Sequence, residues 1–154
     1  MLLPFFRWAD HTWIAVYFRD STWIFALLEV FHLFGLTLLL GTMSVVALRM
    51  CNFGLTRQTL ADVASDAYPF TMGGLLVSVS SGLLLFVSEA LKCYASTPFF
   101  IKMGLLFAGL IFTFTFQRRL TKSDQPSAAA KYAAVLSLAV WFGVGLAGRA
   151  IAFF

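Results

Sequence analysis

The sequence predicts an all-α integral membrane protein, a four-helix bundle with an N-terminal interfacial helix. The first observation is composition: of 154 residues, 60% are hydrophobic and 12% are charged, and the mean hydropathy is +0.87. Soluble domains average about 25% charged residues. A small domain has too much surface to bury so many apolar side chains in water, whereas a bilayer solvates them. The second observation is the spacing of the apolar residues along the chain.

Four apolar stretches are long enough to cross a hydrocarbon core of roughly 30 Å, which takes about 20 helical residues. The predicted spans cover residues 22–48, 69–91, 99–117 and 132–154. Pro69 opens the second span at a first-turn position, where proline is tolerated, and Pro98 directly precedes the third. The whole chain, 1–154, is therefore expected to form a single membrane domain.

The segments outside the spans are short and mostly polar. Residues 2–18 carry apolar side chains near one helical face and Arg7, Asp10 and His11 near another, which predicts an interfacial helix lying on the membrane. The stretch 51–68 is expected to include a surface helix, 92–98 a tight turn, and 118–131 an exposed loop.

Basic residues stand mostly at the ends of the apolar runs, as topology determinants do. Six flank one side of the predicted bundle, against three on the other. The six are Arg49, Arg57, Arg118, Arg119, Lys122 and Lys131, and the three are Arg7, Arg19 and Lys92. The positive-inside rule then predicts a bacterial inner-membrane protein with both termini in the periplasm. The net charge of +4 is therefore not a nucleic-acid signal. The expected partners are the lipid bilayer and other membrane or periplasmic subunits.

The predicted spans place the two cysteines, Cys51 and Cys93, on opposite sides of the membrane, so no disulfide between them is expected. No CxxC or CxxCH motif is present, which argues against covalent c-type haem and zinc-ribbon sites.

Small residues recur inside the spans. Gly74, Ser78 and Gly82 stand four residues apart and form a ridge that lets another helix approach closely, which predicts helix packing. Gly35 in the first span and Gly145 in the fourth are more open to a second interpretation, namely room for a flat cofactor.

Five ionisable side chains lie within or at the ends of the spans, all in the half of the membrane nearest the termini. They are Glu29, His32, Glu89, Lys102 and Arg149. Ionisable groups at such depth are costly and mark functional sites by default. Depth along the helices favours the pairs Glu29–Arg149 and Glu89–Lys102. A structural ion-pair network that fixes helix register is the alternative.

Three roles are open for His32. It is a hydrogen-bonded core residue, an axial iron ligand of haem b, or a group that handles protons or binds a quinone oxygen. In the haem interpretation Gly35 and Gly145 leave space for the ring, and Arg149 and Lys102 pair with the propionates. No second axial ligand is evident from the sequence, and the scattered methionines do not favour copper. The candidate cofactor-binding residues are His32, Glu29, Arg149, Lys102, Gly35 and Gly145.

Two motifs carry a family resemblance: Glu29-Val30-Phe31-His32-Leu33-Phe34-Gly35 and, near the end, Gly148-Arg149-Ala150-Ile151-Ala152. With four spans in about 150 residues, they resemble an uncharacterised family of small bacterial four-span membrane proteins, over most of the chain. A more distant similarity, carried by His32 and Gly35, is to copper-resistance-D-type and other b-type-haem membrane proteins. That similarity implies a haem, although the further histidines usual in those proteins are absent from this sequence.

These observations together predict a non-catalytic inner-membrane subunit or anchor of a redox or respiratory-type assembly. It would bind haem b or a quinone near the periplasmic face through the Glu29, His32 and Arg149 cluster, and so serve electron transfer. Two alternatives remain: a small transporter or channel subunit with a polar path through the same cluster, and a purely structural subunit of a membrane complex. No nucleophile–base pair or phosphate loop is present, so no catalysis by this chain alone is expected.

Overall fold

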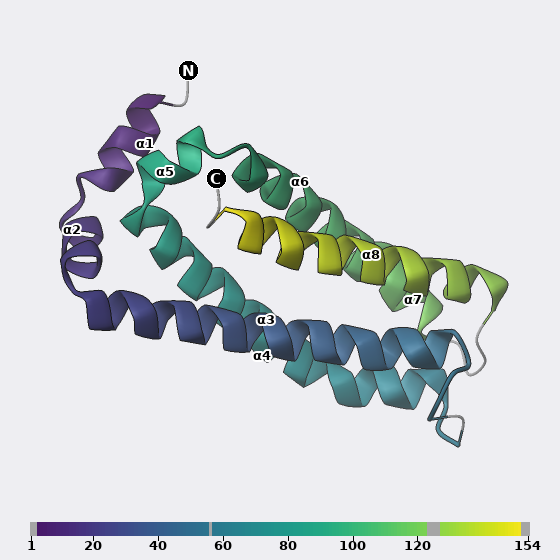
Figure 1. Cartoon of the computed structure of the whole chain (residues 1–154). Coiled ribbons are helices and arrows are strands. Elements are labelled where there is room, and N and C mark those ends of the chain that lie inside the picture. The colour runs from purple at the N-terminus through teal and green to yellow at the C-terminus, as the bar shows by residue number, and fades with distance from the viewer. Residues whose placement is uncertain (1–2, 56, 123–126, 152–154) are drawn as a thin grey trace.

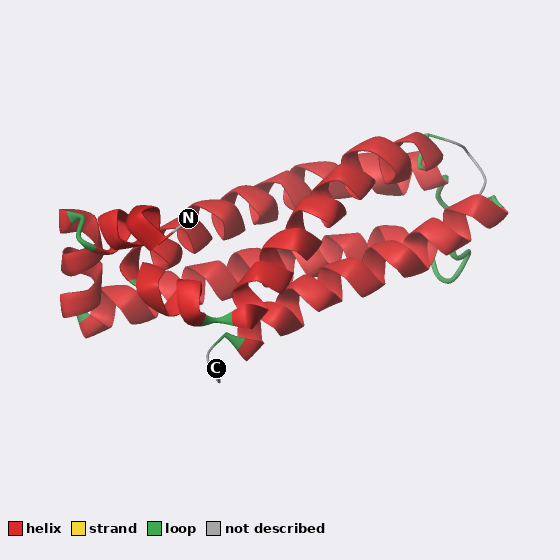
Figure 2. Ribbon diagram, turned by 90° about the horizontal axis from the view of Figure 1, so that it is seen from above, coloured by secondary structure: helices red, strands yellow, loops and turns green. Residues whose placement is uncertain are grey.

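The computed structural model describes residues 3–55, 57–122 and 127–151, and in these ranges the regular structure is entirely helical. Four segments are long and apolar enough to cross a membrane: α3 (Thr22–Met50), α4 (Leu60–Ser88), the continuous segment Thr97–Leu120, and α8 (Ala128–Ala150). The predicted all-α membrane bundle is thereby confirmed. As Figures 1 and 2 show, α3 packs along α4 and α6 (Thr97–Phe112) packs along α8, and α8 also contacts α3 and joins the two pairs.

The bundle has two ends of different character. The chain enters and leaves at one end, called the terminal end, where Figure 1 places both N and C. The other end, called the loop end, carries the connections from α3 to α4 and from α7 (Arg118–Leu120) to α8.

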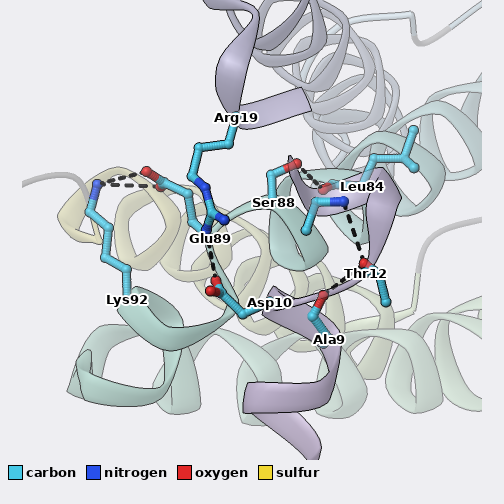
Figure 3. A network of polar contacts seen from close by, with 9 residues as sticks. Ala9, Asp10, Thr12, Arg19, Leu84, Ser88, Glu89 and Lys92 are labelled. Atoms are coloured by element: carbon cyan, nitrogen blue, oxygen red, sulfur yellow. Dashed lines mark hydrogen bonds and ion pairs between the residues drawn. The ribbon is translucent and has the colours of Figure 1, made fainter. Parts of the chain in front are cut away.

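The N-terminal segment forms two helices, α1 (Leu3–Asp10) and α2 (Trp13–Asp20), where one helix over 2–18 was expected. Thr12 causes the break, because its backbone is extended and its hydroxyl caps α2 by accepting from the Ala15 N–H at 3.4 Å. The same hydroxyl donates to the Ala9 carbonyl at 2.8 Å, and an Asp10–Arg19 salt bridge of 3.1 Å ties α1 to α2 (Figure 3).

A short helix, α5 (Ala90–Ala95), lies where a tight turn over 92–98 was expected. It forms because α1 covers it: Phe6 and Ala9 of α1 and Ala90 and Cys93 of α5 make a buried apolar cluster. The N-terminal segment therefore packs on α3, α4 and α5 at the terminal end of the bundle.

The second span begins earlier than its proline and its apolar residues predict. Thr59 is its N-cap, with a side chain that accepts from the Asp62 N–H at 3.1 Å, and Asp62 in the first turn suits the positive end of the helix dipole. Pro69 thus lies inside α4 and not at its first turn. The helix ends at Ser88, three residues before the expected Leu91.

The third and fourth spans are also shifted from their predicted ranges. The third begins at Thr97 with Pro98 in its first turn, and near the loop end it widens into a π-helix, η1 (Thr113–Gln117), before α7. The fourth, α8, begins at Ala128 because the Ser127 hydroxyl accepts from the Ala130 N–H at 3.1 Å. Residues 152–154 of the predicted fourth span lie outside the described residues.

Arg49, expected to be a flanking charge, is buried with 2% of its surface exposed. Its guanidinium donates to the Gln58 carbonyl at 2.9 Å and to the Asn52 side-chain oxygen at 3.1 Å. The buried side chain therefore joins the two ends of the α3–α4 connection by hydrogen bonds, at the loop end.

Helices α3 and α4 cross closely at two glycines. A Cβ added to Gly35 would lie 2.8 Å from the Ser78 backbone nitrogen, and one added to Gly74 would lie 2.8 Å from the Leu39 nitrogen and 3.0 Å from the Gly35 oxygen. Such close backbone approach supplies van der Waals attraction, which drives helix association in lipid because the hydrophobic effect does not.

We expect Gly74→Ala to destabilise the fold by about 1–3 kcal/mol, as overpacking does, because the obstructing atoms belong to backbone. Gly73→Ala is the matched control, since nothing lies within 4 Å of a Cβ added there. Reversible unfolding of both variants in detergent is the measurement. Equal stability of the two variants would contradict this account of the crossing.

Candidate functional site

His32 lies on α3 about 15 Å from Thr22 along the helix axis, and its ring packs on the backbone of α4. A Cβ added to Gly82 would lie 3.0 Å from the His32 Cε1 atom, so the glycine makes room for the imidazole. The ring is partly buried, and its Nδ1 lies 3.1 Å from the Ser81 hydroxyl oxygen. The ridge of Gly74, Ser78 and Gly82 therefore faces α3 over its full length.

The hydrogen bonds of Ser81 favour one tautomer of a neutral His32, with the proton on Nδ1. A serine hydroxyl has one hydrogen to donate, and that of Ser81 has the Val77 carbonyl at 2.5 Å, one helical turn earlier. The Ser81 oxygen is then an acceptor toward His32, so Nδ1 carries the proton and donates. Nε2 is left with its lone pair as the acceptor or ligand atom.

Lys102 of α6 is the second ionisable residue at this site. A Cβ added to Gly148 would lie 3.3 Å from the Lys102 Nζ, so the lysine runs closely against α8. Its partly buried ammonium interacts electrostatically with both His32 and Cys93. Lys102 of α6 thus lies within electrostatic range of His32 of α3.

The carboxylates do not pair as expected. Glu89 forms its salt bridge with Lys92, at 3.3 Å, and not with Lys102 (Figure 3). The salt bridges of the described residues do not join Glu29 to Arg149 either. Both of these side chains are exposed on the surface of the bundle, and Arg149 takes part in an interaction of its own.

The glycines expected to leave space for a flat ring face neighbouring helices instead. Gly35 is buried against Ser78 of α4, and a Cβ added to Gly145 would lie 3.7 Å from the Leu40 side chain. Among the described residues, no three His, Cys, Asp or Glu side chains gather as a metal-binding group. His32 therefore stands as a single imidazole beside one ammonium, between packed helices.

Cys93 lies close to the same site from α5. Burial, followed by the nearby Glu89 carboxylate, raises the pKa of the Cys93 thiol to about 11. The side chain is therefore a protonated thiol of low reactivity at neutral pH, packed in the cluster of α1 and α5. Cys51 and Cys93 are both free cysteines.

Ser81 is the site residue that the sequence did not single out. Its position beside Gly82, on the face of the small-residue ridge, was visible in the sequence. Its partner was not, because which residue of α3 faces Ser81 depends on the register of the α3–α4 crossing.

The chain matches a family of unknown function, DUF6644, over residues 5–154. It belongs to this family. No curated protein and no solved structure matches the chain. The function must therefore be inferred from the residues of the site.

Proposed function

We propose that this chain is a non-catalytic membrane subunit of a redox assembly and that it binds the head group of a quinone or quinol at His32 and Lys102. The observation that supports the proposal most is the 3.1 Å contact between the His32 Nδ1 and the Ser81 hydroxyl, which donates to the Val77 carbonyl; the proton of a neutral ring is then inferred on Nδ1, with Nε2 as the acceptor.

The two side chains complement the two redox states of a quinone. A quinol hydroxyl needs an acceptor, and the His32 Nε2 supplies one. A quinone carbonyl needs a donor, and the Lys102 ammonium has three N–H groups to offer. Because the site lies inside a membrane span, its ligand can enter from the lipid, in which quinones dissolve.

The proposal gives Glu29 a part in proton transfer from His32. It stands one turn before His32 on the same side of α3, nearer the terminal end, and its side chain is exposed. Oxidation of a bound quinol to a quinone releases two protons and two electrons, and in the proposal one of these protons passes through His32 to Glu29. The proposal assigns the two electrons to a redox centre of a partner subunit.

The geometry supports quinone over haem b. His32 offers Nε2 as one axial ligand, but Gly35 is packed against Ser78 and Gly145 lies beside Leu40, so these glycines do not open the space that the haem interpretation gives them. The described residues therefore fit a haem poorly, and the proposal gives haem no role.

Binding of a short-chain quinone to the purified full chain tests the proposal. Loss of one hydrogen bond to a charged or polarised group costs about 1.5–3 kcal/mol, so His32→Ala and Lys102→Met should each weaken binding by about 10-fold to 100-fold. Tryptophan fluorescence quenching or native mass spectrometry measures the affinity.

His11→Ala is the matched control, because His11 is exposed between α1 and α2 and has no part in the contact of His32 with Ser81. The proposal is contradicted if the three variants bind alike or if no quinone binds. A reduced-minus-oxidised haem spectrum, obtained with haem supplied and lost in His32→Ala, would replace quinone by haem b.

We also propose that the protein lies in a bacterial inner membrane with its terminal end at the periplasm. The support is charge: the helix ends and connections of the loop end carry Arg49, Arg57, Arg118, Arg119, Lys122 and Lys131, against Arg7, Arg19 and Lys92 at the terminal end. This orientation places His32 in the periplasmic half of the bilayer.

Reporter fusions to the C-terminus measure this orientation. Alkaline phosphatase, which is active only in the periplasm, should be active there, and a fluorescent protein that folds only in the cytoplasm should stay dark. The reverse pair of results would place His32 in the cytoplasmic half.

A further inference from the structure

A cleft of about 350 Å³ opens at the loop end, far from His32, between α4 on one side and η1 and α7 on the other. Met43 and Val46 of α3 form part of its floor. Its chemistry changes with depth, from basic at the mouth through amide to apolar.

The mouth of the cleft is basic. Arg118 and Lys122 line it, both exposed, and the Arg118 guanidinium is held over the ring of Tyr68 at 5.4 Å from the centroid. The salt bridges of the described residues include neither cation. Asp66, a nearby acid on α4, lines a different cleft, between α4 and α3.

One step deeper lies Gln117, a buried amide with 3% of its surface exposed. Its Oε1 accepts from the Ser137 hydroxyl at 2.8 Å, which orients the group. Its Nε2 has two hydrogens, and the partner found for it is the Met43 sulfur at 4.0 Å, a weak acceptor at long distance. Buried donors are normally satisfied, so this amide has capacity for an oxygen acceptor in the cleft.

The π-helix is what turns Gln117 inward. In an unbroken α-helix, at about 100° per residue, Gln117 would stand roughly 80° around the axis from Gly109, which packs on α8. The wider turn of η1 rotates Gln117 back toward that buried face. Single π-turns of this kind occur frequently at functional sites.

We propose that the cleft binds one anionic phospholipid from the leaflet at the loop end. The phosphate lies between Arg118 and Lys122, an ester carbonyl accepts from the Gln117 Nε2, and an acyl chain lies along Met43, Val46 and Phe114. The order of groups in the cleft matches the order in such a lipid: acidic head, ester, hydrocarbon. Basic pockets between membrane helices are known to take acidic lipid head groups.

Native mass spectrometry of the delipidated full chain tests this site with phosphatidylglycerol as the probe. Each basic side chain near the membrane surface contributes about 1 kcal/mol to binding an acidic lipid, so the double variant Arg118→Gln with Lys122→Gln should bind about 30-fold more weakly. Arg119→Gln is the matched control, because Arg119 is exposed on the same helix but does not line the cleft.

Changing the lipid tests the two remaining parts of the proposal, the charge of the head group and the ester carbonyl. Phosphatidylcholine, with the same esters and no net charge, should bind more weakly than phosphatidylglycerol. A diether phosphatidylglycerol, which lacks the carbonyl acceptor, should bind up to about 10-fold more weakly than the diester.

Three results would overturn the proposal. One is equal binding of the acidic and zwitterionic lipids. Another is an equal loss in Arg119→Gln and in the double variant, which would mean that only general surface charge attracts the lipid. The third is displacement of the lipid by inorganic phosphate at comparable concentration, which would make the site one for a free anion.

Discussion

The close crossing of α3 on α4, made possible by Gly35 and Gly74, is the contact on which the rest of the structure depends. It sets the register between the two helices, because the backbone of each fills the space where the other would carry a side chain. In that register, Ser81 and Gly82 face one turn of α3, and the residue on that turn is His32. A shift of α3 by one residue would turn the imidazole about 100° away from Ser81, and the same shift of α4 would turn Ser81 away from the imidazole.

The two halves of the bundle handle polar groups in different ways. Near the terminal end, the His32 imidazole of α3 and the Lys102 ammonium of α6 lie within electrostatic range, and each lies beside a glycine of a neighbouring helix. Near the loop end, neutral hydrogen bonds join the helices: Gln117 with Ser137, Thr113 with Trp141, and Thr42 with Thr71. In the proposals above, the ionisable groups of the first half exchange protons with a ligand. The amide and hydroxyl groups of the second half hold the π-turn in place and bind a lipid.

Features that depend on composition could be predicted from the sequence, and features that depend on register could not. The four apolar runs were long enough to name the spans, and the four-residue spacing of Gly74, Ser78 and Gly82 marked a packing ridge. Pro69 was misleading because proline is favoured at helix starts, while the actual cap, Thr59, stands ten residues earlier. Helix α5 depends on packing against Phe6 of α1, and the π-turn accompanies the hydrogen bond of Gln117 with Ser137. The partners of Glu29 and Glu89 depend on distances between helices, which no sequence pattern encodes.

The central claim is that the hydrogen bond to Ser81 keeps the proton of His32 on Nδ1 and leaves the Nε2 lone pair as a hydrogen-bond acceptor. Nitrogen-15 NMR of histidine-labelled protein measures this directly, and a His11→Gln background leaves His32 as the only histidine. The account predicts a protonated Nδ1 and an unprotonated Nε2 in the neutral ring, with that preference lost in Ser81→Ala. A neutral ring with its proton on Nε2 would contradict it.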